Sequence, residues 1–321
     1  MNPLTRSMAF TGPLLVFFAA MLWATDAPFR THLTADLSAS FIVLAEHTVN
    51  LLFVLPVLFF NWRELAAFSK REWAAVLVIA IGGSALASIA FTRSFSYVNP
   101  SVAILLQKVQ PLIAISLAAL FLKEYMHRYF WLWAAVAIGG AYLISFPTLY
   151  PRLYEGEAFN PNMLGVFFAL LAAVLWGAST VLGKYVLRVS SFQTLTALRF
   201  GVAFIFLFFL SSIQDQVPPF AAVTGTDWFF IAIVAFVSGA ASLTIYYYGL
   251  QFTKASIATL AELGFPLAAV FVNAYFIAGN VQPGTYFGLY IGQWAGTALL
   301  LFALYMLSRE NRSEIATEQS A

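Results

Sequence analysis

Four charged side chains lie in the middle of long apolar stretches of this 321-residue sequence. They are Lys108, Glu262, Glu46 and Arg199. A charge at the centre of an apolar helix in lipid costs at least about 2.5–3.5 kcal/mol, so such residues are candidates for function or for pairing with one another. Two of the four are cations and two are carboxylates. The set could bind the two ends of a zwitterion, carry a proton, or form buried ion pairs.

Lys108 and Glu262 are the strongest candidates for a binding site. Lys108 lies about nine residues inside its apolar stretch, roughly 13 Å of helix at 1.5 Å per residue. A lysine side chain does not easily reach polar surroundings over that distance. One interpretation is that both residues line a cavity and meet the carboxylate and the amine of a zwitterionic solute. The other is that they form a structural ion pair, which a solute could also break.

Further polar and aromatic residues accompany these charges. Glu46 and Arg199 are interpreted as structural or coupling residues that hold helices together. His47 could carry a proton, because an imidazole changes charge near neutral pH. The remaining candidates for contact with a solute are Gln107, Trp23, Trp176, Tyr246 and Tyr247.

The composition shows which elements must position these residues. Of all residues 61% are hydrophobic and 9% are charged, with a mean hydropathy of +0.84, whereas a soluble domain carries roughly 25% charged residues. Most of the surface must therefore face lipid. The net charge of +2 is too small to indicate nucleic acid, and the absence of cysteine excludes disulfides and thiolate metal sites.

Ten apolar runs are long enough to cross a bilayer as helices, which needs about 20 residues each. They lie near residues 9–28, 38–60, 73–93, 100–122, 129–148, 162–186, 191–211, 227–250, 255–277 and 284–307. Short polar segments connect them, and the residues after Ser308 are expected to form a disordered tail.

With the N-terminus inside, 11 of the 16 Lys and Arg residues fall on the inner side and three on the outer side. This bias predicts a multi-pass protein of the bacterial inner membrane with both termini in the cytoplasm.

The two halves of the chain resemble each other at an offset of 153 to 155 residues. The segment before Trp23 matches the segment before Trp176, and Glu46 matches Arg199. Identical pairs in the fourth and ninth runs are Ser101/Ser256, Ala103/Ala258, Leu105/Leu260, Pro111/Pro266, Leu112/Leu267, Ala114/Ala269 and Phe121/Phe276. Five helices are an odd number, so the second half must enter the membrane in the opposite direction. Inverted repeats of this kind are typical of transporters.

The repeated Ala-x-Leu-Trp segments, the central prolines and the helix end at Phe121–Glu124 resemble the drug/metabolite transporter superfamily, EamA type, with two EamA repeats. The second half departs from this pattern, because residues 276–280 lack the glutamate. Within the superfamily, length and aromatic content look most like the YddG-type amino-acid exporters. The resemblance implies an all-α membrane protein with repeats over 1–150 and 151–307, a tail over 308–321, and a central cavity between helices 1, 3, 4 and 6, 8, 9.

The predicted function is secondary transport of small metabolites by alternating access. Amino acids, including aromatic or other apolar ones, are the first expectation, and proton-coupled export of lipophilic cations is the alternative. No sequence motif for nucleotide hydrolysis or for a nucleophilic or metal-dependent enzyme is present, so no enzyme activity and no cofactor are expected. Only the pair Glu46-His47 would fit an intramembrane enzyme. The expected partners are a small solute and lipid. A stripe of Gly288, Gly292 and Gly296 permits close helix packing, within a monomer or in a dimer.

Overall fold

The computed structural model describes residues 3–94, 97–98, 106–146, 163–214, 222–272 and 290–318, and within these ranges every regular element is helical. Gly288 lies outside the described residues. The first half contains α1 (Pro3–Trp23), η1 (Ala24–Asp26), α2 (Ala27–Asp36), α3 (Ala39–Phe60), α4 (Trp62–Ala66), α5 (Lys70–Leu77), η2 (Val78–Leu86), α6 (Ala87–Ser94), α8 (Gln110–Leu117), η3 (Ala118–Leu122) and α9 (Arg128–Ser145). The second half contains α10 (Met163–Val186), α11 (Phe192–Ile213), α12 (Gly225–Ile233), η5 (Val234–Ala241), α13 (Ser242–Leu250), α14 (Ala255–Ala261), α15 (Gly264–Val272) and α16 (Ile291–Glu318).

Eight helices of the described part are long and apolar enough to cross a membrane. They cover Ser7–Asp26, Ser40–Phe60, Lys70–Phe91, Met163–Val186, Phe192–Ile213, Gly225–Leu250, Ala255–Val272 and Ile291–Ser313. A shorter apolar helix covers Gln110–Leu122. A multi-pass membrane protein is thereby supported, whereas the count of ten helices and the inverted arrangement of the halves stay predictions.

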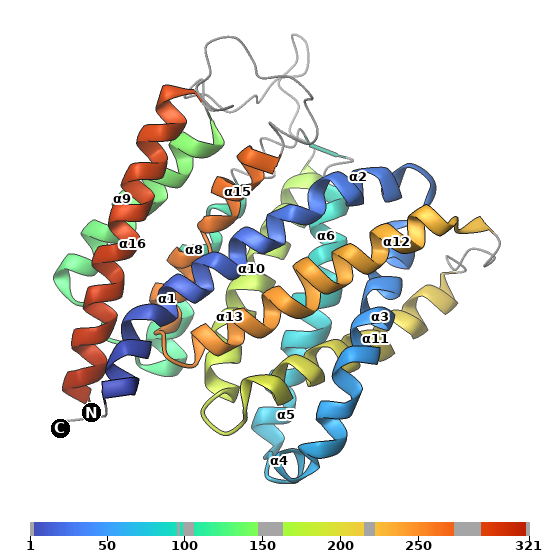
Figure 1. The fold of residues 1–321 in the computed structure, drawn as a ribbon, viewed down its shortest axis with the longest axis horizontal. Coiled ribbons are helices and arrows are strands. Elements are labelled where there is room, and N and C mark those ends of the chain that lie inside the picture. The colour runs from blue at the N-terminus through green and yellow to red at the C-terminus, as the bar shows by residue number, and fades with distance from the viewer. Residues whose placement is uncertain are drawn as a thin grey trace.

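Both termini lie at the same end of the molecule (Figure 1), which is called the terminal end below. Several helices begin there at residues that satisfy free backbone N–H groups. Ser69 and Glu72 form a capping box at the start of α5, and Ser191 caps α11 by accepting a hydrogen bond from the N–H of Thr194. Such caps fix where a helix begins because the first N–H groups have no partner within the helix.

Two of the membrane helices contain wide π-helical turns at corresponding places in the two halves. The segment η2 continues α5 and leads into α6, and η5 continues α12 and leads into α13. A π-helical turn shifts the register of backbone hydrogen bonds and is frequent at functional sites. In η2, Gly82 and Gly83 are buried against α10, where Leu175 and Ser179 are their neighbours.

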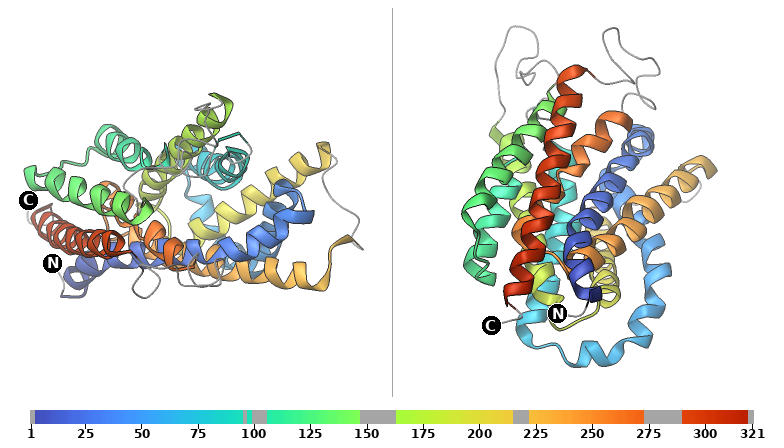
Figure 2. Two further views of the ribbon diagram at one scale, coloured as in Figure 1. Left: turned by 90° about the horizontal axis from the view of Figure 1, so that it is seen from above. Right: turned by 60° about the vertical axis from the view of Figure 1, so that its left-hand side comes forward.

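Helices α9 and α16 lie side by side at one edge of the molecule (Figure 2). Their backbones touch, since a Cβ atom at Gly140 would lie 2.7 Å from the carbonyl oxygen of Gly296. Gly296 therefore packs within the chain, whereas a Cβ at Gly292 would meet no atom within 4 Å. The structure contradicts the expected disordered tail, because α16 continues to Glu318. Asn311 is fully buried and donates a hydrogen bond to the carbonyl of Ala9.

Gly140 and Gly139 provide a matched test of this packing. We expect Gly140→Val to lower the stability by about 1–3 kcal/mol, the usual cost of overpacking, because the new side chain would overlap α16. Gly139→Val makes the same change of helix propensity in open space, where a Cβ would meet no atom within 4 Å. Thermal unfolding of both variants in detergent checks the prediction. Equal shifts in the two variants would show that the α9–α16 contact is not the cause.

Candidate functional site

Two helices, one from each half, are interrupted at corresponding positions in the chain. In the first half Lys108 and Val109 form a turn immediately before α8, and in the second half Glu262 and Leu263 form a turn between α14 and α15. Each turn comes shortly before a proline, Pro111 or Pro266. A proline has no N–H group to donate to the carbonyl four residues earlier, so the helix is broken there. Paired helix breaks are the commonest position of binding sites in transporters with repeats.

Glu262 forms hydrogen bonds to three other helices at this break. Its Oε1 atom accepts from Thr180 of α10 and from Tyr246 of α13, both at 2.8 Å. Its Oε2 atom accepts from Nε2 of Gln110 on α8, also at 2.8 Å. The hydroxyl groups of Thr180 and Tyr246 are 3.0 Å apart. Glu262 therefore joins the first half, through Gln110, to a polar cluster that the second half builds.

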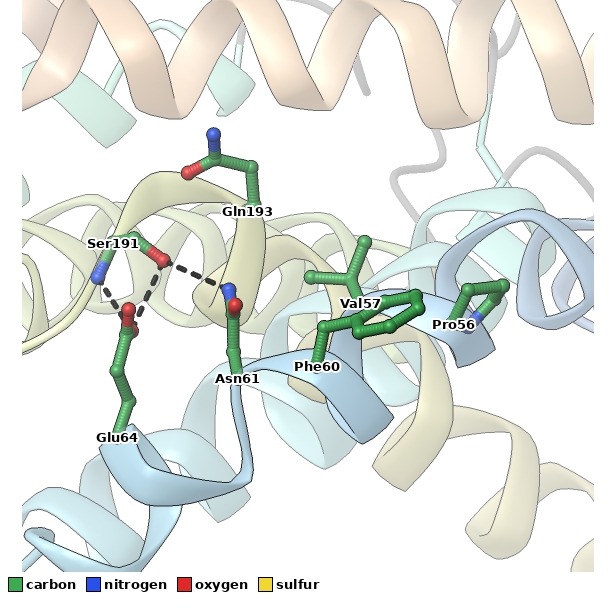
Figure 3. Close-up of a pocket in the computed structure, with 7 residues that line it drawn as sticks. All are labelled: Pro56, Val57, Phe60, Asn61, Glu64, Ser191 and Gln193. Carbon is green, nitrogen blue, oxygen red and sulfur yellow. Dashed lines mark hydrogen bonds between the residues drawn. The ribbon is translucent and has the colours of Figure 1, made fainter.

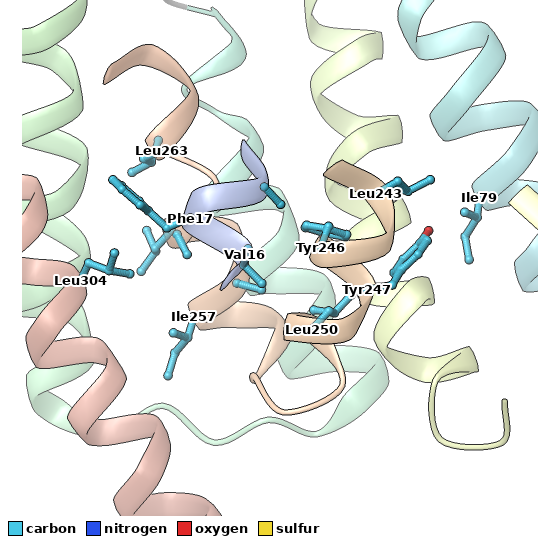
Figure 4. Close-up of a cluster of buried hydrophobic side chains, with 14 of the residues drawn as sticks. Val16, Phe17, Ile79, Leu243, Tyr246, Tyr247, Leu250, Ile257, Leu263 and Leu304 are labelled. Carbon is cyan, nitrogen blue, oxygen red and sulfur yellow. The ribbon is translucent and has the colours of Figure 1, made fainter. Parts of the chain in front are cut away.

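Aromatic rings flank this polar cluster. Trp23 of α1 lies against Tyr246 with ring centroids 5.2 Å apart, and Tyr246 lies 5.3 Å from Tyr247. On α13, Tyr246 lies on the side of Val16 and Tyr247 on the side of Ile79 (Figure 4). Both tyrosines are buried. Trp23, Tyr246 and Tyr247, three of the aromatic candidates from the sequence, therefore lie next to one another, and their contact with a solute stays a prediction.

Arg199 joins α11 to the same region. Its Nε atom donates to Ser84 of η2 at 2.6 Å, and its Nη1 atom donates to the hydroxyl of Tyr247 at 2.9 Å. The guanidinium carbon lies 5.9 Å from the centre of the Tyr247 ring. Arg199 forms no ion pair with Glu46 among the described residues.

Lys108 is partly buried and has no hydrogen-bond or ion-pair partner among the described residues. The structural ion pair with Glu262 that the sequence allows is therefore not formed in this conformation. Gln107 is also partly buried. Gln110, which begins α8 after the turn, makes the contact with Glu262 instead.

Trp176, His47 and Glu46 lie away from the hydrogen bonds of Glu262. Trp176 donates from Nε1 to the carbonyl of Gly83 at 3.0 Å. His47 and Glu46 are buried on α3, where Nδ1 of His47 lies 2.8 Å from the carbonyl of Val43. The structure thus brings Trp23, Tyr246, Tyr247, Arg199 and Glu262 together and leaves these three outside the cluster.

Sequence reasoning missed Gln110, Thr180 and Ser84. Thr180 follows Trp176 by four residues, so helical periodicity places it on the same face as a selected residue. Gln110 is likewise close in sequence to a selected residue, Gln107. Ser84 had none of this kind, because its contact with Arg199 comes from a different half of the chain.

At the terminal end, three carboxylates of the first half accept hydrogen bonds from the second half, and we call them the carboxylate clamps. Glu64 accepts from the N–H and hydroxyl groups of Ser191, at 2.8 and 3.0 Å. Glu72 accepts from the hydroxyl of Tyr185 at 2.8 Å. Glu124 accepts from the N–H groups of Ala255 and Ser256 and from the Ser256 hydroxyl, at 2.7, 3.0 and 2.7 Å.

An apolar cluster lies beside the Glu124 clamp. It contains Ala114, Ala118 and Leu122 of the first half and Val181 and Ala255 of the second half. Together, the clamps and this apolar cluster hold the two halves in contact at the terminal end in this conformation.

A cavity of about 440 Å³ lies on the outside of the molecule between α3 and α11 (Figure 3). Asn61, Glu64 and Ser191 form its polar side, and exposed Pro56 and Phe60 form its apolar side. It shares the Glu64 clamp and none of the residues around Glu262. Exposed rings of this kind on a membrane helix face lipid, so the cavity is not the interior site. In the described part, no three His, Asp or Glu side chains are placed to hold a metal ion.

Comparisons with known proteins agree with this architecture. The model of the EamA-like transporter family matches the chain twice, over residues 10–146 and 163–309. The riboflavin transporter ImpX of Fusobacterium nucleatum is 30% identical over 305 residues, which are 94% of this chain and 98% of that protein. A solved crystal structure has a TM-score of 0.69 at 16% identity, covering 94% of this chain and 98% of its own, and shows the fold alone. The chain therefore belongs to the EamA-like transporter family of the drug/metabolite transporter superfamily, and it is a membrane transporter rather than an enzyme.

Proposed function

We propose that this transporter carries a small metabolite with a flat ring and a polar edge by alternating access, and that riboflavin is its solute. One observation carries the proposal: the rings of Trp23 and Tyr246 lie beside the hydrogen-bonding cluster of Glu262 where the two corresponding helices are broken. A flat aromatic solute can stack on such rings. Its polar edge then reaches the amide of Gln110 and the carboxyl of Glu262.

The chemistry of riboflavin fits these groups. Its ring system is planar and uncharged, one edge carries an N–H group between two carbonyl groups, and its side chain carries hydroxyl groups. Glu262 offers an acceptor for the N–H group, and Lys108 offers a donor for a carbonyl group. The relative named a riboflavin transporter supports the assignment, because it aligns with nearly the whole chain.

An aromatic amino acid is the second candidate, as the sequence and the resemblance to YddG-type exporters predict. The observation in its favour is the presence of cations and a carboxylate in one region. Lys108, which has no partner within the described part of the chain, is suited to a carboxylate, and Glu262 is suited to an amine. A lipophilic cation, the alternative from the sequence, would favour a carboxylate without other partners, whereas Glu262 already accepts three hydrogen bonds.

The direction of the chain in the membrane is part of the proposal. Lys70, Arg71, Lys184 and Lys254 lie near the terminal end, and the excess of Lys and Arg on one side assigns this end to the cytoplasm of a bacterial inner membrane. Both termini are then cytoplasmic.

Counterflow in proteoliposomes tests the function. Vesicles loaded with unlabelled solute should take up labelled riboflavin faster than they take up labelled tryptophan. We expect Trp23→Ala to slow riboflavin counterflow about tenfold, because an aromatic contact contributes about 0.5–1.5 kcal/mol beyond its buried area. The control is Trp131→Ala, which removes an exposed ring of α9. Faster exchange of tryptophan than of riboflavin would assign the protein to the amino-acid class, and exchange of neither would refute both assignments.

A further inference from the structure

The cavity between α3 and α11 lies where two membrane spans end. The span of α3 ends at Phe60, and the span of α11 begins at Phe192. Three polar residues that line the cavity come just beyond these ends, namely Asn61, Glu64 and Ser191. The cavity therefore lies at the level expected for the head groups of the surrounding lipid. Its volume of about 440 Å³ is within the range of roughly 300–1,000 Å³ that is usual for sites of small molecules.

The apolar side of this cavity continues a surface that faces lipid. Pro56 and Phe60 line the cavity from α3, and both are exposed. Phe53 lies three and seven residues before them, so helical periodicity places it on the same face. Its side chain is 57% exposed. An acyl chain can lie along this face of α3 while the head group of the same lipid molecule enters the cavity.

The polar side of the cavity carries acceptor oxygens that the described part of the chain leaves without hydrogen bonds. Oε2 of Glu64 accepts from the N–H and hydroxyl groups of Ser191, whereas Oε1 has no such partner. Nδ2 of Asn61 donates to the hydroxyl of Thr194 at 2.9 Å, and Oδ1 of Asn61 has no partner. The exposed amide of Gln193 lines the cavity from α11 (Figure 3). The cavity therefore suits a ligand that donates hydrogen bonds.

The charge of Glu64 requires a cation. No Lys or Arg side chain of the described residues forms an ion pair with it. The neighbouring Arg63 is exposed, and its guanidinium carbon lies 5.8 Å from the centre of the Trp62 ring instead. A primary ammonium group supplies both the charge and three N–H donors. A trimethylammonium group supplies the charge without any N–H group. Arg63 is the nearest cation along the chain for a phosphate group bound to the same ligand.

We propose that this cavity binds the head group of a phospholipid with a primary ammonium group, of which phosphatidylethanolamine is the simplest. The ammonium group donates to Oε1 of Glu64, and the acyl chains lie along the face of α3 that carries Phe53 and Phe60. Glu64 also joins the two halves through Ser191. The lipid therefore contacts a residue that holds the terminal end together. The proposal does not depend on which solute the protein carries.

Native mass spectrometry of the delipidated protein tests this site. The protein in detergent is titrated with phosphatidylethanolamine and, separately, with phosphatidylcholine of the same acyl chains. We expect the first lipid to bind about tenfold more tightly in a one-to-one adduct, the usual effect of a charge-assisted hydrogen bond. Equal binding of the two lipids would overturn the proposal.

Three variants locate the lipid. Glu64→Gln keeps an oxygen that can accept from Ser191 but removes the charge, so it should abolish the preference for phosphatidylethanolamine. Glu72→Gln makes the same change at a carboxylate clamp that does not line the cavity, and it should keep the preference. Gln193→Ala changes an exposed residue of the cavity and should weaken the preference. This variant decides the question if Glu64→Gln does not fold.

Two outcomes would contradict the assignment. A preference that persists in the folded Glu64 and Gln193 variants would place the lipid elsewhere on the protein. Displacement of phosphatidylethanolamine by an equal concentration of free phosphoethanolamine would assign the cavity to a soluble amine, because the acyl chains would then contribute nothing. Retention of the lipid under that competition, together with its loss in Glu64→Gln, supports the proposal.

Discussion

Replacing Arg199 by methionine is expected to cause the largest loss of stability among single substitutions in the interior. The change removes hydrogen bonds to Ser84 of η2 and Tyr247 of α13, so two neighbouring helices lose a contact with α11. Hydrogen bonds between membrane helices contribute about 0.6–1.7 kcal/mol each, which predicts a loss of about 1–3 kcal/mol. Counterflow should therefore fall with the stability.

Arg309→Met is the matched control for this substitution. Arg309 lies 5.9 Å from the centre of the Tyr305 ring, the same separation as between Arg199 and Tyr247. It is exposed on α16, and its loss should change neither unfolding nor counterflow measurably. Arg199→Lys restores the charge but not the two hydrogen bonds, because an ammonium group lacks the fork of a guanidinium. Compared with Arg199→Met, the Arg199→Lys variant should regain more of the wild-type counterflow rate than of the wild-type stability. Equal unfolding temperatures for Arg199→Met and the wild-type protein would contradict the assigned role.

Removing the Glu124 clamp is expected to have the largest effect on the closure of the terminal end. Glu124 of the first half accepts three hydrogen bonds at the start of α14, and Glu262 follows the last residue of the same helix. Seven residues separate the two contacts, about 10 Å of helix. Loss of three contacts at about 0.6 kcal/mol each predicts opening of this end about ten- to twentyfold more often.

The absence of cysteine from the chain makes this opening measurable. A single cysteine at Ala114, which is fully buried beside the clamp, should react slowly with a polar maleimide in nanodiscs. Adding Glu124→Ala should raise the labelling rate by the expected factor. Adding Asp36→Ala, which removes an exposed carboxylate of α2, should leave the rate unchanged. An unchanged rate in the Glu124 variant would show that the clamp does not hold the end closed.

The two predictions together describe how solute binding and closure are connected. α14 contacts α8 and α10 along its length, and it carries the Glu124 clamp at one end and Glu262 at the other. A change in the hydrogen bonds of Glu262 therefore acts on the same short helix that the clamp holds. This is the physical basis on which occupancy of the site and opening toward the cytoplasm can depend on each other.

The sequence by itself shows that most of the surface of this protein faces lipid and that the chain contains a repeat. It also shows which charged residues lie inside apolar stretches. Apolar composition excludes a water-facing surface, and the paired Trp23/Trp176 and Pro111/Pro266 identify two related halves. The missing N–H group of Pro111 and Pro266 permits a helix break but does not by itself determine one, because Pro13 and Pro56 lie inside continuous helices. Glu262 and Arg199 were identified because a charge in an apolar helix is costly.

Only the tertiary structure decided which of these residues meet. Lys108 and Glu262 lie in corresponding turns but form no ion pair, and Gln110 rather than Gln107 reaches the carboxyl. Which glutamine reaches Glu262 depends on how the helix segments are rotated relative to each other at the break. The spacing of residues along the chain does not show this rotation. The ordered tail has the same cause, since Asn311 becomes buried only when α16 packs against α1. The sequence therefore predicts where each charged group lies along its helix, and the packing of helices from both halves decided its partner.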